Sequence, residues 1–161
     1  VLSQTGKEYR LKEALADLDS FDFVVMDTPP SLNIITINAL TASDYAVIPA
    51  QADIFSLQGI TQLGQTIEAV KRYTNNDLKV LGIVLTKHNT RSILSRDLQK
   101  VITDTATHIH TKVYTQFIRE AVAVREAQAM KQDIFSYDAK SNPAKDYDLL
   151  MKEVWKDICH E

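Results

Sequence analysis

The sequence predicts an α/β fold with a mainly parallel sheet and helices on both faces. Three short apolar runs carry this prediction, namely Phe21–Met26, Tyr45–Ile48 and Val80–Leu85. Continuous apolar runs of this length are typical of strands buried on both faces. Amphipathic stretches alternate with them, and a helical connection between two buried strands forms a parallel βαβ unit.

The amphipathic stretches predict the helices in chain order. Leu57–Val70 carries apolar residues at spacings of three and four, with Ser56 as the expected N-cap. A final helix is expected to open at Asn142 and Pro143, as cap and first turn. His108–Tyr114 is a weaker candidate for a fourth strand. Similar helical patterns fill 9–18, 32–41, 93–102 and 121–130.

Composition indicates one folded domain. The 161 residues are 45% hydrophobic and 24% charged, which excludes a disordered chain, and we find no repeat or Gly/Ser/Pro linker. The single cysteine, Cys159, excludes an intrachain disulfide, an iron–sulfur cluster and a cysteine-rich zinc site. No apolar run approaches the ~20 residues of a membrane span, and the N-terminus lacks a signal-peptide core. We therefore expect a cytoplasmic protein without a membrane partner.

Charge is unevenly distributed along the chain. Residues 1–85 carry 6 basic and 10 acidic side chains, residues 86–131 carry 8 and 4, and residues 132–161 carry 4 and 7. The middle segment is thus +4 (8 − 4), although the whole chain is −3. This asymmetry directs the search for an anionic partner to the middle segment. An ordinary solvated face is the alternative explanation.

The segment after the first apolar run, Asp27-Thr28-Pro29-Pro30, is the candidate for chemistry. A carboxylate at the tip of a buried strand is where P-loop NTPases keep the acid that holds Mg²⁺, a hard cation that prefers oxygen ligands. The two prolines remove backbone donors and stiffen the loop. Taken in isolation, a strand that ends in an Asx-type turn accounts for these residues equally well.

The longer context resembles the ParA family of partition ATPases, part of the deviant-Walker ParA/MinD group. Phe21–Leu32 is similar to the family's Walker B and switch II region, and the similarity continues in order through 36–51, 55–63 and 82–86. It extends to Arg91-Ser92, Glu126-Ala127 and 144–147, so it spans nearly the whole chain. The resemblance implies a P-loop NTPase-like sheet.

One departure from the family is as informative as the match. No segment fits G-x-x-x-x-G-K-[ST], because the only glycines are Gly6, Gly59, Gly64 and Gly82. In the family the phosphate loop follows a first strand that lies upstream of Walker B. We therefore expect residues 1–161 to be the C-terminal part of a single ParA-like ATPase domain that lacks the first strand and the P-loop. Such a chain is expected to be inactive alone and, through its exposed sheet edge, to self-associate.

The resemblance assigns roles to particular residues. Asp27 is the Walker B acid, the catalytic residue that holds Mg²⁺ through water, while Thr28, Pro29 and Pro30 sense the γ-phosphate of ATP. Thr86, Lys87 and His88 correspond to the place where the family contacts the base, although the family often has an aromatic–acid pair where this chain has His88-Asn89.

Nucleic-acid contacts are expected in the basic middle segment. By resemblance, an ATP-bound homodimer binds DNA without sequence preference, associates with the nucleoid and is reset by a ParB-like centromere-binding protein. The candidate DNA contacts are Arg91, Arg119, Arg125 and Lys131. The family often has proline where this chain has Arg119.

Several alternatives remain open at this point. The chain could be a non-catalytic module that binds DNA or a partner, or a MinD-like membrane switch, although its acidic C-terminal stretch disfavours anionic lipid. A nitrogenase-iron-protein type of reductase lacks its cluster cysteines. His108 and His110 are expected to share one face of a strand, as two residues of a half-buried strand. Trp155 is expected to pack in the core with the apolar stripe of the last helix.

Overall fold

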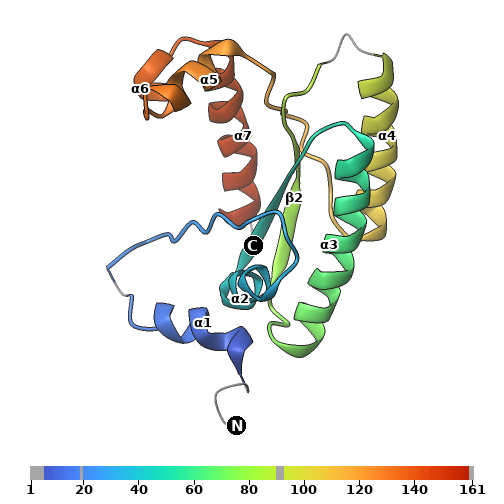
Figure 1. Ribbon diagram of the computed structural model, residues 1–161, viewed down its shortest axis with the longest axis vertical. Coiled ribbons are helices and arrows are strands. Elements are labelled where there is room, and N and C mark those ends of the chain that lie inside the picture. The colour runs from blue at the N-terminus through green and yellow to red at the C-terminus, as the bar shows by residue number, and fades with distance from the viewer. Residues whose placement is uncertain (1–5, 19, 90–92, 160–161) are drawn as a thin grey trace. The chain divides into compact units, whose positions relative to one another are not determined.

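The computed structural model describes residues 6–18, 20–89 and 93–159 (Figure 1). It comprises two compact units, one formed by residues 1–46 and 61–80 and the other by residues 47–60 and 81–161. Strand β1 (Tyr45–Ala50), helix α3 (Ile54–Tyr73) and strand β2 (Lys79–Leu85) each contribute residues to both units. The predicted α/β class is confirmed, and the strands are parallel.

The first unit contains a 3₁₀ turn (Lys7–Tyr9), α1 (Arg10–Leu15) and α2 (Ile34–Ala42). Helix α1 is shorter than the predicted 9–18, whereas α2 matches its prediction closely. Asn33 caps α2, because its side chain accepts a hydrogen bond from the Ile35 N–H at 2.9 Å. Asn38 then joins α2 to the preceding elements, accepting from the Leu11 N–H and donating to the Lys7 carbonyl.

The expected strand Phe21–Met26 is wrong for the described structure. The run lies outside every strand, and Phe21, Phe23 and Val25 are 67%, 59% and 93% exposed. An extended segment becomes a strand only through ladder hydrogen bonds to a neighbour. Within the described residues, β1, β2 and the bridges to residues 113 and 119 account for the sheet pairing, and this apolar run is not part of it.

The predicted strands at 45–48 and 80–85 are confirmed as β1 and β2, which pair with each other. The Lys79 N–H donates to the Asp44 carbonyl and the Thr86 N–H to the Ala50 carbonyl, so the two strands run in the same direction. Helix α3 connects them, as the βαβ pattern predicts. Its cap is Asp53 and not Ser56, because the Asp53 carboxylate accepts from the Ser56 N–H at 2.7 Å.

The predicted fourth strand at His108–Tyr114 is wrong, because the described residues there form no strand. Helix α4 (Ile93–His108) extends to that residue, and His110 turns the chain with a φ of 54°. The two histidines therefore do not share a strand face, and both are exposed. The residues that follow form isolated parallel bridges with β2 and the residues after it, Ile83 with Val113 and His88 with Arg119.

Three helices complete the second unit: α5 (Val122–Ala129), α6 (Ile134–Asp138) and α7 (Asn142–Cys159). Helix α6 is absent from the sequence prediction, and its cap is Asp133, which accepts from the Phe135 and Ser136 N–H groups. Helix α7 opens where predicted, but Ser141 caps it through the Ala144 N–H.

The core expected around α7 is only partly present. Leu150 and Val154 are each 8% exposed, whereas Trp155 is 49% exposed, so the prediction that Trp155 packs in the core is wrong. A helix buries one stripe, and Trp155 lies one residue beyond Val154 and outside it. Among the described helices, none is both long and apolar enough to cross a bilayer.

Candidate functional site

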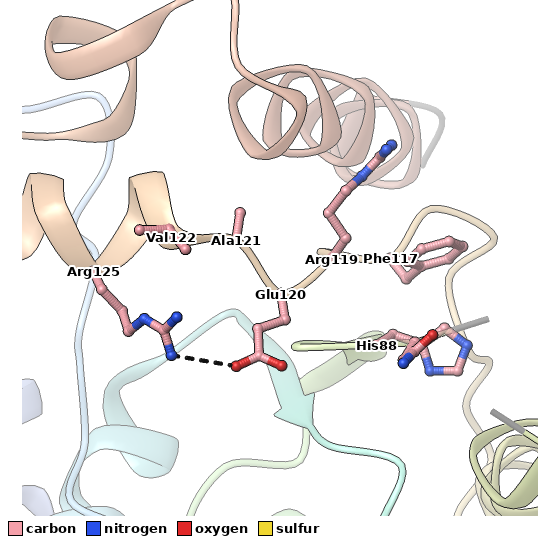
Figure 2. A pocket seen from close by; sticks show the side chains of 8 residues that line it. His88, Phe117, Arg119, Glu120, Ala121, Val122 and Arg125 are labelled. Carbon is pink, nitrogen blue, oxygen red and sulfur yellow. Dashed lines mark ion pairs between the residues drawn. The ribbon is translucent and has the colours of Figure 1, made fainter. Parts of the chain in front are cut away.

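A cavity of about 700 Å³ lies in the second unit, at the carboxyl end of β2 (Figure 2). In parallel sheets this end of the strands is where ligands bind. Two segments form the walls, the residues that follow β2 and the residues between the Ile83–Val113 bridge and α5. The lining residues are His88, Asn89, Phe117, Arg119, Glu120, Ala121, Val122 and Arg125.

Backbone hydrogen bonds fix the first wall. The Thr86 N–H donates to the Ala50 carbonyl at 2.7 Å, and the His88 N–H donates to the Ile118 carbonyl at 3.1 Å. Lys87, between them, has a φ of 48° and an exposed side chain. Of the three predicted base-contact residues, the structure thus brings His88 to the cavity, while Thr86 and Lys87 lie outside its lining.

His88 is the most unusual polar side chain of the site. It is 4% exposed, and among the described residues neither ring nitrogen has a hydrogen-bond partner of acceptable geometry. Its ring and that of Phe117 are steeply inclined to each other, at 70°, with centroids 4.9 Å apart. Burial lowers the pKa of His88, an effect that nearby Gln99 partly offsets. At neutral pH the imidazole is therefore mainly uncharged.

The second wall is held by an ion pair with α7. Arg119 donates from Nε and Nη2 to the two carboxylate oxygens of Asp146, both at 2.7 Å. Asp146 is 1% exposed, whereas the Arg119 side chain is 45% exposed. The hydrogen bonds from Asp146 raise the pKa of Arg119 further above its ordinary value. This bidentate geometry is the strong form of an arginine–carboxylate pair.

The other charges of the lining also compensate one another. Glu120 and Arg125 form an ion pair at 3.5 Å, with both side chains largely exposed (Figure 2). With Arg119 bound to Asp146 and His88 mainly neutral, the described lining carries no uncompensated cation. This environment suits an uncharged planar group better than a phosphate, which requires donors or positive charge.

The predicted phosphate-sensing residues lie in the first unit. Asp27, Thr28, Pro29 and Pro30 are all exposed. No group of three or more His, Cys, Asp or Glu side chains in the described part of the chain is arranged to hold a metal ion. Asp27 therefore belongs to no such group among the described residues, and a magnesium site there would need further ligands or retained waters.

The predicted DNA contacts have different environments. Arg91 lies outside the described residues. Arg119 and Arg125 are engaged in the ion pairs above, and Lys131 is exposed with a φ of 54°, just after α5. Two of these cations are thus partly compensated.

Sequence reasoning missed Asp146, Phe117 and Glu120. Asp146 had a usable signal, because it lies four and eight residues before the buried Leu150 and Val154 and so shares their face of α7. An acidic residue in an apolar stripe requires a buried partner. No comparable pattern marks Phe117 or Glu120.

Comparison with known proteins agrees with this architecture. A family model described as an AAA domain matches residues 1–80. Over 157 residues, 95% of this chain and 58% of the relative, the sequence is 38% identical to the chromosome partitioning protein ParA of Caulobacter vibrioides. Over 150 residues, 92% of this chain and 58% of the relative, it is 40% identical to the sporulation initiation inhibitor protein Soj of Bacillus subtilis. The chain is thus a homologue of the partitioning proteins ParA and Soj over nearly its whole length. It spans just under three-fifths of the length of these relatives.

Solved structures extend the comparison. A cobyrinic acid a,c-diamide synthase of Mycobacterium smegmatis with bound ATP analog and magnesium is 42% identical over 64% of this chain and 41% of its own, with a TM-score of 0.59. Apo McdA of Cyanothece aligns over 95% of this chain and 61% of its own, with a TM-score of 0.81. Its identity of 17% supports the ParA-like fold alone.

Proposed function

We propose that this chain is part of a ParA-type partition ATPase, which couples ATP-dependent dimerisation to sequence-independent DNA binding during chromosome or plasmid segregation. The observation that carries the proposal is the identity of 38–40% with ParA and Soj over at least 92% of the chain. Because the chain covers 58% of those relatives, the activity is proposed for the longer protein.

The cavity at the end of β2 is the proposed site for the nucleotide base. Its volume of about 700 Å³, the aromatic ring of Phe117 and the neutral imidazole of His88 suit a planar heterocycle. The orphaned nitrogens of the buried His88 are consistent with a ligand or water completing their hydrogen bonds. Thr86 and Lys87 lie outside the lining, and their backbone would hold His88 in place.

The phosphate end of ATP is proposed to lie at Asp27, with Thr28, Pro29 and Pro30 responding to the γ-phosphate. Bound Mg²⁺ neutralises the charge that develops on the transferred phosphoryl group. Asp27 would contribute a carboxylate to the water shell of that ion. The G-x-x-x-x-G-K-[ST] loop is not in this sequence, so the chain alone is expected to bind ATP weakly and not to hydrolyse it.

DNA is the proposed anionic partner of the +4 segment, through Arg91, Arg119, Arg125 and Lys131. The protein is expected to bind a ParB-like partner and to associate with the nucleoid in the cytoplasm. Phosphate contacts release counterions, so DNA affinity should decrease steeply with salt. A MinD-like membrane role gains no support from α7, because its apolar stripe is used for packing.

A chimaera tests the proposal. The 161-residue chain would be joined to those parts of Bacillus subtilis Soj that lie outside the 150 matched residues. We expect this chimaera to hydrolyse ATP and the 161-residue chain alone not to do so. Asp27→Asn should reduce hydrolysis about 100-fold or more, because electrostatic stabilisation of the transferred group is lost.

Asp22→Asn is the matched control, because Asp22 is an exposed acid in the same segment and should leave the rate unchanged. A chimaera that unfolds in one sharp thermal transition and binds DNA but hydrolyses no ATP would contradict the ATPase proposal and favour the non-catalytic module. Binding to anionic vesicles instead of DNA would favour the membrane switch.

A further inference from the structure

Asp146 is a buried carboxylate that the proposed ATP chemistry does not use. It is 1% exposed on α7, and it accepts three hydrogen bonds from one residue, Arg119. Two come from the guanidinium at 2.7 Å and the third from the Arg119 backbone N–H at 3.2 Å. Asp146 therefore fixes both the side chain and the backbone of Arg119.

That backbone belongs to the wall of the cavity. Immediately before Arg119, the Ile118 N–H donates to the Leu85 carbonyl at 2.8 Å, and the Ile118 carbonyl accepts from the His88 N–H at 3.1 Å. Immediately after it, Glu120 lines the cavity. A shift of Arg119 would therefore displace both the residue that anchors His88 and the residue that faces the ligand.

Successive side chains of an extended segment point in opposite directions. Figure 2 shows this alternation, with Arg119 directed towards a helix and Glu120 directed to the other side, where it meets Arg125. The carboxylate on α7 thus turns the Arg119 guanidinium away from Glu120. Without that carboxylate, the wall would carry an uncompensated cation beside the cavity.

We propose that Asp146 is a positioning residue for this cavity: by holding Arg119 it sets the wall from Ile118 to Val122 and keeps the Arg119 charge out of the binding space. The identification of the ligand as a nucleotide base rests on the proposed function. The alternative is that the pair only attaches α7 to the rest of the unit. These two roles make different predictions when the pair is replaced by apolar residues.

The decisive variant is Arg119→Met with Asp146→Leu. Replacement of a buried ion pair by apolar side chains often leaves stability unchanged or raises it. In this variant α7 stays packed against the rest of the unit. The hydrogen bond from the backbone N–H of residue 119 to Asp146 and the oriented charge of Arg119 are both lost. We expect hydrogen exchange of the His88 amide to become about tenfold faster or more, since its acceptor lies in the released wall. We also expect the NMR signals of the His88 ring to shift.

The matched control replaces the exposed pair of the same helix, Asp148→Leu with Lys152→Met, and should leave the His88 signals unchanged. Wild-type exchange and ring signals in the folded Arg119→Met, Asp146→Leu variant would overturn the proposal. If that variant does not fold, Arg119→Lys provides the test, because lysine keeps the charge without the bidentate geometry. It should accelerate His88 exchange, and an unchanged rate would again overturn the proposal.

In the Soj chimaera, the same double substitution should raise the KM for ATP about tenfold with little change in kcat, as expected when only ligand binding is perturbed. Equal loss in kcat would contradict a role confined to the base pocket. A chimaera without ATPase activity would remove the proposed function, while the His88 exchange measured on the 161-residue chain would still decide whether Asp146 positions the wall.

Discussion

Two apolar runs of similar length have opposite environments in this molecule. Phe21–Met26 lies outside every described strand, with Val25 93% exposed. In β2, residues 81–85 are all buried, and Ile83 is 0% exposed. Strand β2 pairs with β1 on one side and with the residues around Val113 on the other.

The comparison shows that apolarity alone does not make a strand. Both runs carry the side chains that buried strands use, but among the described residues only β2 pairs within a sheet. The relatives are longer than this chain, which covers 58% of ParA and of Soj. We expect the first run to become a strand only where the part of the relatives that this chain does not match supplies a neighbouring strand.

We expect the largest effect on residues 21–26 when a longer protein supplies a neighbouring strand for them. In the chimaera with Soj, backbone amides of residues 21–26 should exchange about 100-fold slower or more, because a paired strand opens only with its surrounding unit. Hydrogen exchange followed by mass spectrometry measures this change, and amides in β2 serve as the internal control. Unchanged exchange in residues 21–26 would mean that the segment is a loop in the longer protein too.

The chain alone offers a second measurement of the same property. Exposed apolar segments and open sheet edges recruit other chains. Sedimentation at several concentrations should therefore show self-association of the 161-residue chain and less of it for the chimaera. A monomer at all concentrations would argue against an open edge.

A pair of substitutions compares the two runs directly. Ile83→Ala should reduce the free energy of unfolding by about 2–5 kcal/mol, because it leaves a cavity in the fully buried strand. Val25→Ala should change it by less than about 0.5 kcal/mol, since the side chain is almost wholly exposed. Urea denaturation of the two variants gives both values. Similar losses would show that residues 21–26 are packed in solution.

Much of the fold could be predicted because local pattern and final environment agree. Strands β1 and β2, helix α3 and the start of α7 follow from apolar runs and spacing, and the structure confirms them. The Phe21–Met26 strand could not be judged from its own residues, because its environment depends on a neighbour distant in sequence. The cap of α3 was misassigned to Ser56 since Asp53 and Ser56 are both good capping residues three positions apart.

The candidate site was only partly visible in the sequence. His88 was predicted because the segment after β2 resembles the place where the family contacts the base, and strand ends are where ligands bind. The opposite wall was not, because Phe117 and Glu120 reach the cavity through a pairing with β2 that no local pattern encodes. Arg119 was predicted as a DNA contact, and its ion pair was missed because its partner Asp146 lies 27 residues further along the chain.

The next prediction rests on the close packing of Tyr114 against Gly82 of β2. A Cβ added at Gly82 would lie 2.5 Å from the ring of Tyr114, which is 3% exposed and donates through its hydroxyl to Asp157 at 2.8 Å. Since that ring is held at both ends, Gly82→Ala should cost about 1–3 kcal/mol of unfolding free energy. Thermal or urea denaturation measures the loss.

Gly59→Ala is the matched control, because nothing lies within 4 Å of a Cβ at that position in α3. Alanine favours a helix interior over glycine, so this variant should gain up to about 1 kcal/mol. A neutral Gly82→Ala would show that the Tyr114 ring can move without loss and that the contact with β2 is looser than the structure indicates.

The smallest expected effect is the pH dependence of the unfolding free energy that the buried His88, just after β2, produces. Burial lowers the pKa of His88 in the folded state below its ordinary value of 6.5, despite the opposing effect of Gln99. As the pH falls below 6.5, the unfolded chain therefore takes up a proton before the folded chain does. Stability should be complete above that pH and should decline as the pH falls through the folded-state pKa. His88→Leu should reduce this decline, because the variant has no proton to bind at that position.

His110→Asn is the control, since His110 is exposed and asparagine tolerates its φ of 54°. Urea denaturation between pH 5 and pH 7.5 should show a shallower dependence for His88→Leu and an unchanged one for His110→Asn. The exposed segment 21–32 contains no histidine, so it adds nothing to this titration. An unchanged slope in His88→Leu would mean that the imidazole is hydrated in solution. The buried environment of β2 would then not extend to His88 and the cavity.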